Sequence, residues 1–390
     1  MLKTTPLTVR GKLADPSLWH RDGGEIHLGC SQCNERELCG GLSIGAPVHN
    51  CLDLCCGNHG SCTRYACPLS VRRYAALVNE VGGLALRPYT KPVAPMLAVP
   101  DYVPTILDAG SLAGPLHIPV VAISLYKVID GRTGLAKFSS RQELLAAFRI
   151  YSDAKVILTA SAEDALVERF WEHRQSKATA ESLKKIRPAL IATPNFSMHA
   201  EAVRHDNLVS MARIAACFED FASAGLPAAL HVNGRTPHDF DRWAIYLNQS
   251  PWISVVSYEM GTMGRSSVRR AWHAAQLVRL ARSVNRPLSL LIRGGAEHLT
   301  MLAEAFGRVV WTDTTAHMKA KKRQIGTSSS AAVSWRSSPT KAGEPIDELL
   351  LHNIRVYQRM TRALLPKRGL PPRELVADQL LLAGSLSSGG

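Results

Sequence analysis

The stretch ISVVSYEMGTMGRSSVRRAWHAAQLVRLARSVNRPLSLLIR, residues 253–293, places one amphipathic segment between two short apolar ones. The apolar segments, 253–259 and 288–293, are typical of buried strands, whereas 267–284 has the period of a helix. A connection of this length favours parallel pairing of the two strands, because parallel strands need a long crossover. The stretch therefore predicts a strand–helix–strand unit.

The same alternation extends on both sides of this stretch, from residue 103 to residue 313. Six further apolar runs are predicted strands: 103–109, 119–126, 155–160, 188–193, 227–232 and 308–313. Four further amphipathic segments are predicted helices: 140–151, 162–174, 207–223 and 239–247. Seven or eight such units predict an α/β fold with a TIM-like (β/α) barrel, complete or degenerate, over 101–323. An open doubly wound sheet is the alternative.

Helix starts are marked by residues that typically cap helices. Ser140 precedes Glu143, Ser161 precedes Asp164, and Thr236 precedes Asp239 with a proline between. Each pair has the spacing of a capping box, in which the first side chain accepts a hydrogen bond from the backbone of the second. Three of the predicted helices are therefore expected to begin at these positions.

Polar side chains stand at the end of nearly every predicted strand. They are Lys127, Asn195, His231, Asn233, Glu259, Arg293, Asp313 and His317. Active sites of such barrels gather where strands pass into the following helices, so these positions favour a ligand site. The alternative is that strand ends face water and their polar residues cap helices. The glycine pair after Arg293, Gly294 and Gly295, would also let backbone amides approach an anion.

If the protein is an enzyme, these residue types predict separate roles. The predicted catalytic residues are Asp313, Glu259, His231 and His317. A carboxylate would act as nucleophile or general base, and an imidazole would move protons near pH 7. The predicted substrate-binding residues are Asn195, Asn233, Arg293, Lys319, Trp335 and Arg336. Among them, Arg293 and Lys319 are expected to hold a phosphate.

Eight of the nine cysteines lie between residues 30 and 67. In a reducing compartment, clustered thiols are more often metal ligands than disulfides. The predicted metal ligands, enough for two four-thiolate centres, are Cys30, Cys33, Cys39, Cys51, Cys55, Cys56, Cys62 and Cys67. The ninth, Cys217, lies on the apolar face of a predicted helix and is expected in the core.

The spacing of the clustered cysteines leaves the metal open. Only Cys30 and Cys33 form a zinc-type CxxC pair. A cysteine followed by proline, as at Cys67, also ends bacterial ferredoxin motifs. An iron–sulfur cluster is the preferred cofactor and zinc the alternative, with disulfides or free structural thiols as a third possibility. A radical S-adenosylmethionine enzyme would carry CxxxCxxC, but position 58 is asparagine, so that class would require a nonstandard spacing through Cys62.

The charge of the chain indicates its partner. Lys and Arg number 46 against 32 Asp and Glu, a formal net charge of +14. Residues 319–368 contain eleven basic and three acidic side chains. The positive potential of such a segment attracts nucleic acid, DNA or RNA, and makes the binding sensitive to salt. Exposed basic faces are also common on helices that bind nothing. Trp335 and Arg336 are a candidate stacking pair for an unpaired base.

Composition also divides the chain into segments. Residues 1–100 form an N-terminal segment with the metal-binding block, and 101–323 form the barrel. The Ser-, Gly- and Ala-rich stretch 324–345 predicts a mobile loop, 346–368 a basic helix, and 369–390 a tail with a disordered end. The first twelve residues have no apolar core of a secretory signal, and no run approaches the roughly 18 apolar residues of a spanning helix. We therefore expect a soluble cytoplasmic protein without a membrane partner.

Two resemblances add to these expectations. Residues 190–234, LIATPNFSMHAEAVRHDNLVSMARIAACFEDFASAGLPAALHVNG, resemble the central part of an uncharacterised domain family of phages and plasmids, with Asn195 in place of the expected acid. The plan of a barrel with cysteine-bound metal and a basic surface is similar to that of tRNA-guanine transglycosylase-like enzymes, whose metal cysteines follow the barrel rather than precede it. These resemblances imply an enzyme that modifies bases or nucleotides in a mobile element or phage defence system.

Two classes of function therefore stay open. In the first, the protein is a metal-containing enzyme that acts on nucleic acid. In the second, the barrel and the basic segment bind nucleic acid or a partner protein without chemistry, and the metal only stabilises the N-terminal segment. The two classes differ in whether the strand-end residues converge on one site.

Overall fold

The computed structural model describes residues 77–365 except 78, 175–177, 199–203, 262–265, 329–331 and 339. The cysteine block 30–67, the two last basic residues of the predicted basic segment and the tail 369–390 lie outside the described residues. The predictions made for them, including both metal alternatives, therefore stay predictions.

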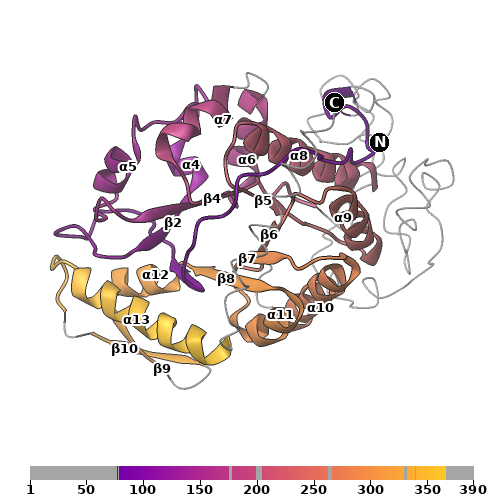
Figure 1. The fold of residues 1–390 in the computed structure, drawn as a ribbon. Helices are drawn as coiled ribbons and strands as arrows, with labels where there is room; N and C mark the ends of the chain where they lie inside the picture. The colour runs from indigo at the N-terminus through magenta and orange to yellow at the C-terminus, as the bar shows by residue number, and fades with distance from the viewer. Residues whose placement is uncertain are drawn as a thin grey trace, which may run out of the picture.

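Eight parallel strands form a nearly closed barrel, in the order β1-β8-β7-β6-β5-β4-β3-β2 (Figure 1). They are β1 (Tyr102–Pro104), β2 (Val120–Ser124), β3 (Lys155–Thr159), β4 (Leu190–Ala192), β5 (Ala228–His231), β6 (Val255–Glu259), β7 (Ser289–Arg293) and β8 (Arg308–Asp313). Between β1 and β2 the sheet continues as a single parallel bridge from Thr105 to Ala122. Ile106 N donates to Ala122 O at 3.0 Å beside it. Each strand overlaps one predicted apolar run, so the predicted TIM-like barrel is confirmed.

Helices follow the strands from β2 onward and lie outside the barrel (Figure 1). They are α4 (Leu125–Val128), α5 (Arg141–Ala147), α6 (Asp164–Arg174), α7 (Ala178–Leu183), α8 (Arg204–Ser223), α9 (Pro237–Gln249), α10 (Ser267–Ser283), α11 (Leu299–Ala305), α12 (Thr315–Lys321) and α13 (Asp347–Leu364). Two short 3-10 helices are η1 (Lys184–Ile186) and η2 (Ala296–His298).

Two of the three predicted helix caps are confirmed. Ser140 Oγ accepts from Glu143 N at 3.1 Å, and Thr236 begins α9 with a full capping box. The third is wrong, because α6 begins only at Asp164 and the Ser161 side chain bonds to Glu259 instead. Ser161 therefore belongs to the mouth of the barrel rather than to a helix start.

The buried apolar side chains form two layers. The larger lies between the strands and the surrounding helices and contains Cys217, which is fully buried as predicted. The smaller fills the inside of the barrel. This inner layer is built from side chains of all eight strands, since alternate residues of a strand point to opposite faces.

The barrel departs from a regular TIM plan after β1. Residues 105–119 contain no helix, so β1 lacks the crossover helix that follows the other strands. The C-terminal helix α13 instead packs against this side, where the Tyr357 ring stacks on that of Tyr102 at 5.5 Å between centroids. A helix from the end of the chain thus covers the apolar surface that the missing helix leaves.

The structure differs from the sequence expectation over 324–345. Strands β9 (Gln324–Ser328) and β10 (Val333–Ser337) form an antiparallel hairpin there. Its apolar side chains, Ile325, Val333 and Trp335, pack on the core. The fully buried Asn353 of α13 fixes the hairpin, because its side chain accepts from Gly326 N at 2.9 Å and donates to Gln324 O at 3.0 Å. Packing on α13 thus overrides a Ser- and Gly-rich composition that predicts a loop.

Candidate functional site at the mouth of the barrel

Polar side chains line the inside of the barrel toward the carboxyl ends of its strands. The inner apolar layer includes Val103, Ala122, Ile157, Ala229, Val255, Leu291 and Val310. Two residues further along, on the same face of the same strands or just beyond them, stand Thr105, Ser124, Thr159, His231, Ser257, Arg293 and Thr312. The interior therefore changes from apolar to polar toward the end at which barrel enzymes place their active sites.

Glu259 and Arg293 form the central ion pair of this mouth. They are directly paired residues of β6 and β7, and Glu259 Oε2 lies 3.2 Å from Arg293 Nη1. Glu259 Oε1 accepts from Gly261 N at 2.6 Å, and the Ser161 side chain also bonds this carboxylate. Burial raises the pKa of Glu259, while Arg293 and the hydrogen bonds lower it again. A buried carboxyl group whose pKa is raised by burial and lowered by a neighbouring cation is suited to proton transfer.

Asp313 completes a row of three charged residues on β6, β7 and β8. Its Oδ1 accepts from Thr315 N at 2.5 Å and its Oδ2 from Thr315 Oγ1 at 3.1 Å. Burial raises the pKa of Asp313, and the Thr315 bonds and the Arg293 charge oppose this rise. The charge of Asp313 in turn raises the pKa of Glu259. Glu259 and Arg293 are therefore in contact, and Asp313 at the end of the neighbouring strand acts on both electrostatically.

A glycine after β7 allows this arrangement. Gly294 has a φ of 73°, and a Cβ added there would lie 2.8 Å from the backbone nitrogen of Gly261. Only a residue without a side chain lets the loop after β7 approach the loop after β6 so closely. The role of the glycine pair in anion binding stays a prediction. Gly294 allows the close approach that positions the Gly261 N–H, which donates to Glu259.

Two tyrosines near Asp313 join the mouth to α13. Asp313 raises the pKa of both Tyr102 and Tyr357, and Tyr357 hydrogen-bonds the side chain of Thr315. Sequence reasoning missed these residues together with Ser161 and Thr315. Their positions could have identified the two hydroxyl residues, since Ser161 directly follows predicted strand 155–160 and Thr315 stands two residues after strand 308–313. Tyr357 lies in a helix 44 positions beyond Asp313, where no local pattern identifies it.

The predicted histidines lie in buried places. His231 faces into the barrel, with Nδ1 3.4 Å from Ser257 Oγ, and burial lowers its pKa to about 3. His317 accepts from Leu107 N at 3.0 Å through Nδ1, and burial lowers its pKa to about 4. Both imidazoles are therefore neutral at pH 7. The hydrogen bond to His317 fixes Leu107 in the loop after β1, and Lys127 Nζ donates to the carbonyl oxygen of the same residue.

The two predicted asparagines form one cluster after β4 and β5. Asn233 Nδ2 donates to Asn195 Oδ1 at 2.8 Å and to Phe196 O at 3.0 Å. Asn233 Oδ1 accepts from Gly234 N and from Arg235 Nη1, at 3.0 and 3.2 Å. These bonds use the amide of Asn233 fully and make it a support for the loops, whereas the side-chain N–H groups of Asn195 have no acceptor among the described residues.

The three predicted binding residues after the barrel lie on the α12–hairpin side. Lys319 Nζ stands 5.2 Å from the centroid of the Trp335 ring, which is half-buried and lies 6.1 Å from the Tyr357 ring. Arg336 is exposed on β10. Trp335 and Tyr357 therefore connect this group to the network around Asp313.

Metal and membrane features are lacking from the part of the chain that the structure describes. No three His, Cys, Asp or Glu side chains within it come together as metal ligands. No helix within it is long and apolar enough to span a bilayer. No known protein family and no curated protein matches the chain.

Proposed function

We propose that the protein is an enzyme that modifies a nucleobase or nucleotide unit of nucleic acid at the mouth of its barrel. The observation that carries this proposal is the row Glu259, Arg293 and Asp313, with Glu259 only 3% exposed and both carboxyl pKa values raised by burial. Burying the Glu259 carboxylate beside Arg293, with the largely buried Asp313 nearby, costs free energy that a purely structural site could avoid with apolar residues. Perturbed groups of this kind concentrate where chemistry occurs.

The reaction that fits two carboxyl groups is exchange at an N-glycosidic bond. One carboxylate, Asp313, attacks C1′ of the sugar, and the bond between C1′ and the base nitrogen breaks with its electron pair leaving on the base. Glu259, whose pKa is raised by burial, is the group that would give a proton to that leaving base. A new base or water then displaces the Asp313 carboxylate and returns a proton to Glu259. Arg293 stabilises whichever carboxylate is charged at each stage.

The charge of the molecule supports nucleic acid as the substrate. The net charge is +14, and Arg355, Arg359 and Arg362 are exposed on α13, the helix whose Tyr357 reaches the Asp313 network. Phosphate backbones bind such surfaces by releasing counterions. The resemblance in plan to transglycosylase-like enzymes, and of residues 190–234 to a phage and plasmid family, favours a mobile-element or defence setting. The alternative is a binding module without chemistry.

An oligonucleotide that carries a cationic pyrrolidine ring in place of one sugar tests the proposed chemistry. It mimics the positive charge that develops at C1′, and such mimics bind at least about 100-fold more tightly than substrates. We expect this preference in fluorescence-anisotropy titrations, and its loss in Glu259→Gln and Asp313→Asn. Equal affinity of the wild-type protein for modified and plain strands would favour the binding module.

A metal centre in the cysteine block is the second part of the proposal. Eight thiols between Cys30 and Cys67 predict one to two centres of iron, as a cluster, or zinc per chain. Elemental analysis and visible absorption of anaerobically purified protein distinguish the two metals. Because binding of a structural metal is also folding free energy, Cys51→Ser should lower metal content and expose the block to protease, while Cys217→Ser should retain the metal. Stably folded protein without metal contradicts this prediction.

A further inference from the structure

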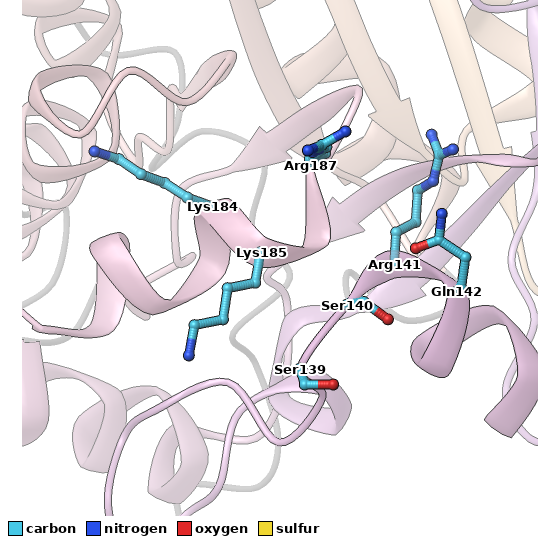
Figure 2. Close-up of a pocket in the computed structure, with 7 residues that line it drawn as sticks. All are labelled: Ser139, Ser140, Arg141, Gln142, Lys184, Lys185 and Arg187. Carbon is cyan, nitrogen blue, oxygen red and sulfur yellow. The ribbon is translucent and has the colours of Figure 1, made fainter.

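A basic hollow of about 480 Å³ lies on the outside of the barrel, between the start of α5 and η1 (Figure 2). Arg141 and Gln142 line it from α5, and Lys184, Lys185 and Arg187 line it from η1 and the residue after it. Arg187 comes just before β4, at the amino end of that strand. The hollow is therefore separate from the mouth, which lies at the carboxyl ends of the strands.

The cations of this hollow are largely unneutralised. Lys184 pairs with Glu181 at 2.7 Å, but no carboxylate of the described chain forms an ion pair with Arg141, Lys185 or Arg187. Arg141 Nε is buried and has no hydrogen-bond partner among the described residues. Because this Nε is buried, a ligand in the hollow would meet the terminal Nη atoms of Arg141, which also have no partner among the described residues.

The backbone at Arg187 is left-handed where η1 ends, and this conformation sets the direction of its side chain. Its φ is 48° and its ψ is 58°, the left-handed region that glycine or asparagine occupies more easily. Figure 2 shows the guanidinium groups of Arg187 and Arg141 extending in the same direction from opposite sides of the hollow.

We propose that this hollow binds the phosphate groups of a small polyphosphate ligand, such as a nucleotide. Guanidinium groups donate paired hydrogen bonds to phosphate oxygens, and a volume of about 480 Å³ is within the range of small-ligand sites. In Figure 2 the amino groups of Lys184 and Lys185 extend away from the two guanidinium groups, so Arg141 and Arg187 are the pair expected to bind the phosphate groups directly. This inference does not depend on the chemistry at the mouth.

Calorimetric titration with pyrophosphate, ATP and a 20-nucleotide single strand tests it. Arg141→Met and Arg187→Gly should each weaken pyrophosphate and ATP binding by about tenfold or more, the effect of losing a hydrogen bond to a charged group. Arg149→Gly is a matched control, since Arg149 is also exposed, has a φ of 50°, and lies outside the hollow. Both glycine variants should be at least as stable as the parent protein, because glycine adopts this backbone without strain.

Three results would overturn the proposal. One is a lack of binding of pyrophosphate and ATP to the wild-type protein. Another is equal weakening by all three variants, which would indicate an effect of net charge. The third is loss of affinity for the single strand alone, which would make the hollow part of a nucleic-acid track.

Discussion

Replacing Arg293 by Met should lower the free energy of unfolding by about 3 kcal/mol at pH 7, within the range found when one partner of a buried ion pair is removed. The side chain of Glu259 is 1% exposed and that of Arg293 29%, so the substitution leaves a buried carboxylate without its cation. Asp313 also loses the charge that lowers its pKa. Chemical denaturation of the two proteins measures the difference.

The loss should depend on pH in a defined direction. Burial raises the pKa of Glu259 above its ordinary value of 4.5, so this group contributes stability that is complete below that value and is lost as the pH rises through the folded-state pKa. Removing Arg293 raises the folded-state pKa further. The deficit of Arg293→Met should therefore be smaller at pH 4 than at pH 7.

Two further variants control this experiment. Glu259→Gln combined with Arg293→Met should recover much of the loss, because the uncompensated charge is gone. Arg362→Met, at an exposed position of α13, should change stability by less than about 0.5 kcal/mol. A deficit for Arg293→Met that is the same at pH 4 and pH 7 would contradict the proposed balance of charges.

Affinity for single-stranded nucleic acid should fall by about two decades between 50 and 200 mM salt if five or six basic residues contact phosphates. The structure indicates which residues to replace. Lys321 is held by Asp108 at 2.8 Å, and Arg323 donates to Glu344 O, whereas Arg355, Arg359 and Arg362 are exposed.

Replacing these three arginines together by Gln should reduce the slope of log affinity against log salt by about 2, since each contact contributes about 0.7 for single strands. Replacing Lys91, Arg132 and Lys137, exposed residues on other segments, removes the same charge and should leave the slope nearly unchanged. Anisotropy titrations at three salt concentrations give both slopes. Equal slopes for the two triple variants would exclude α13 as the binding face. Trp335→Ala is a less direct test, because Trp335 also packs on Tyr357.

The strands and the central row of the site were predictable from sequence for a simple reason. Each apolar run is bounded by a turn and ends in a polar residue, and parallel strands bring those ends to one side. Glu259 and Arg293 therefore meet although they are far apart in the chain, and Asp313 stands at the end of the neighbouring strand. The neutral state of His231 and His317 was not predictable, because it results from burial by residues of other elements.

Other features depend on contacts between residues far apart in the chain, which no local sequence pattern predicts. The Ser-rich stretch forms a hairpin because Trp335 packs on the core and Gly326 N donates to Asn353 of α13. Ser161 has the spacing of a helix cap, yet it bonds Glu259 across the barrel. Tyr357 reaches the Asp313 network only because α13 covers the side of the barrel that lacks a helix.

Nucleoside analysis by mass spectrometry tests the central claim most directly. DNA and RNA are isolated from cells that express the wild-type protein, Glu259→Gln or Asp313→Asn at equal levels, and their nucleosides and abasic sites are compared. Our account predicts a modified nucleoside or abasic site that appears with the wild-type protein and is absent with both variants. Identical profiles for all three proteins, with each protein folded and bound to nucleic acid, would contradict catalysis by Glu259 and Asp313.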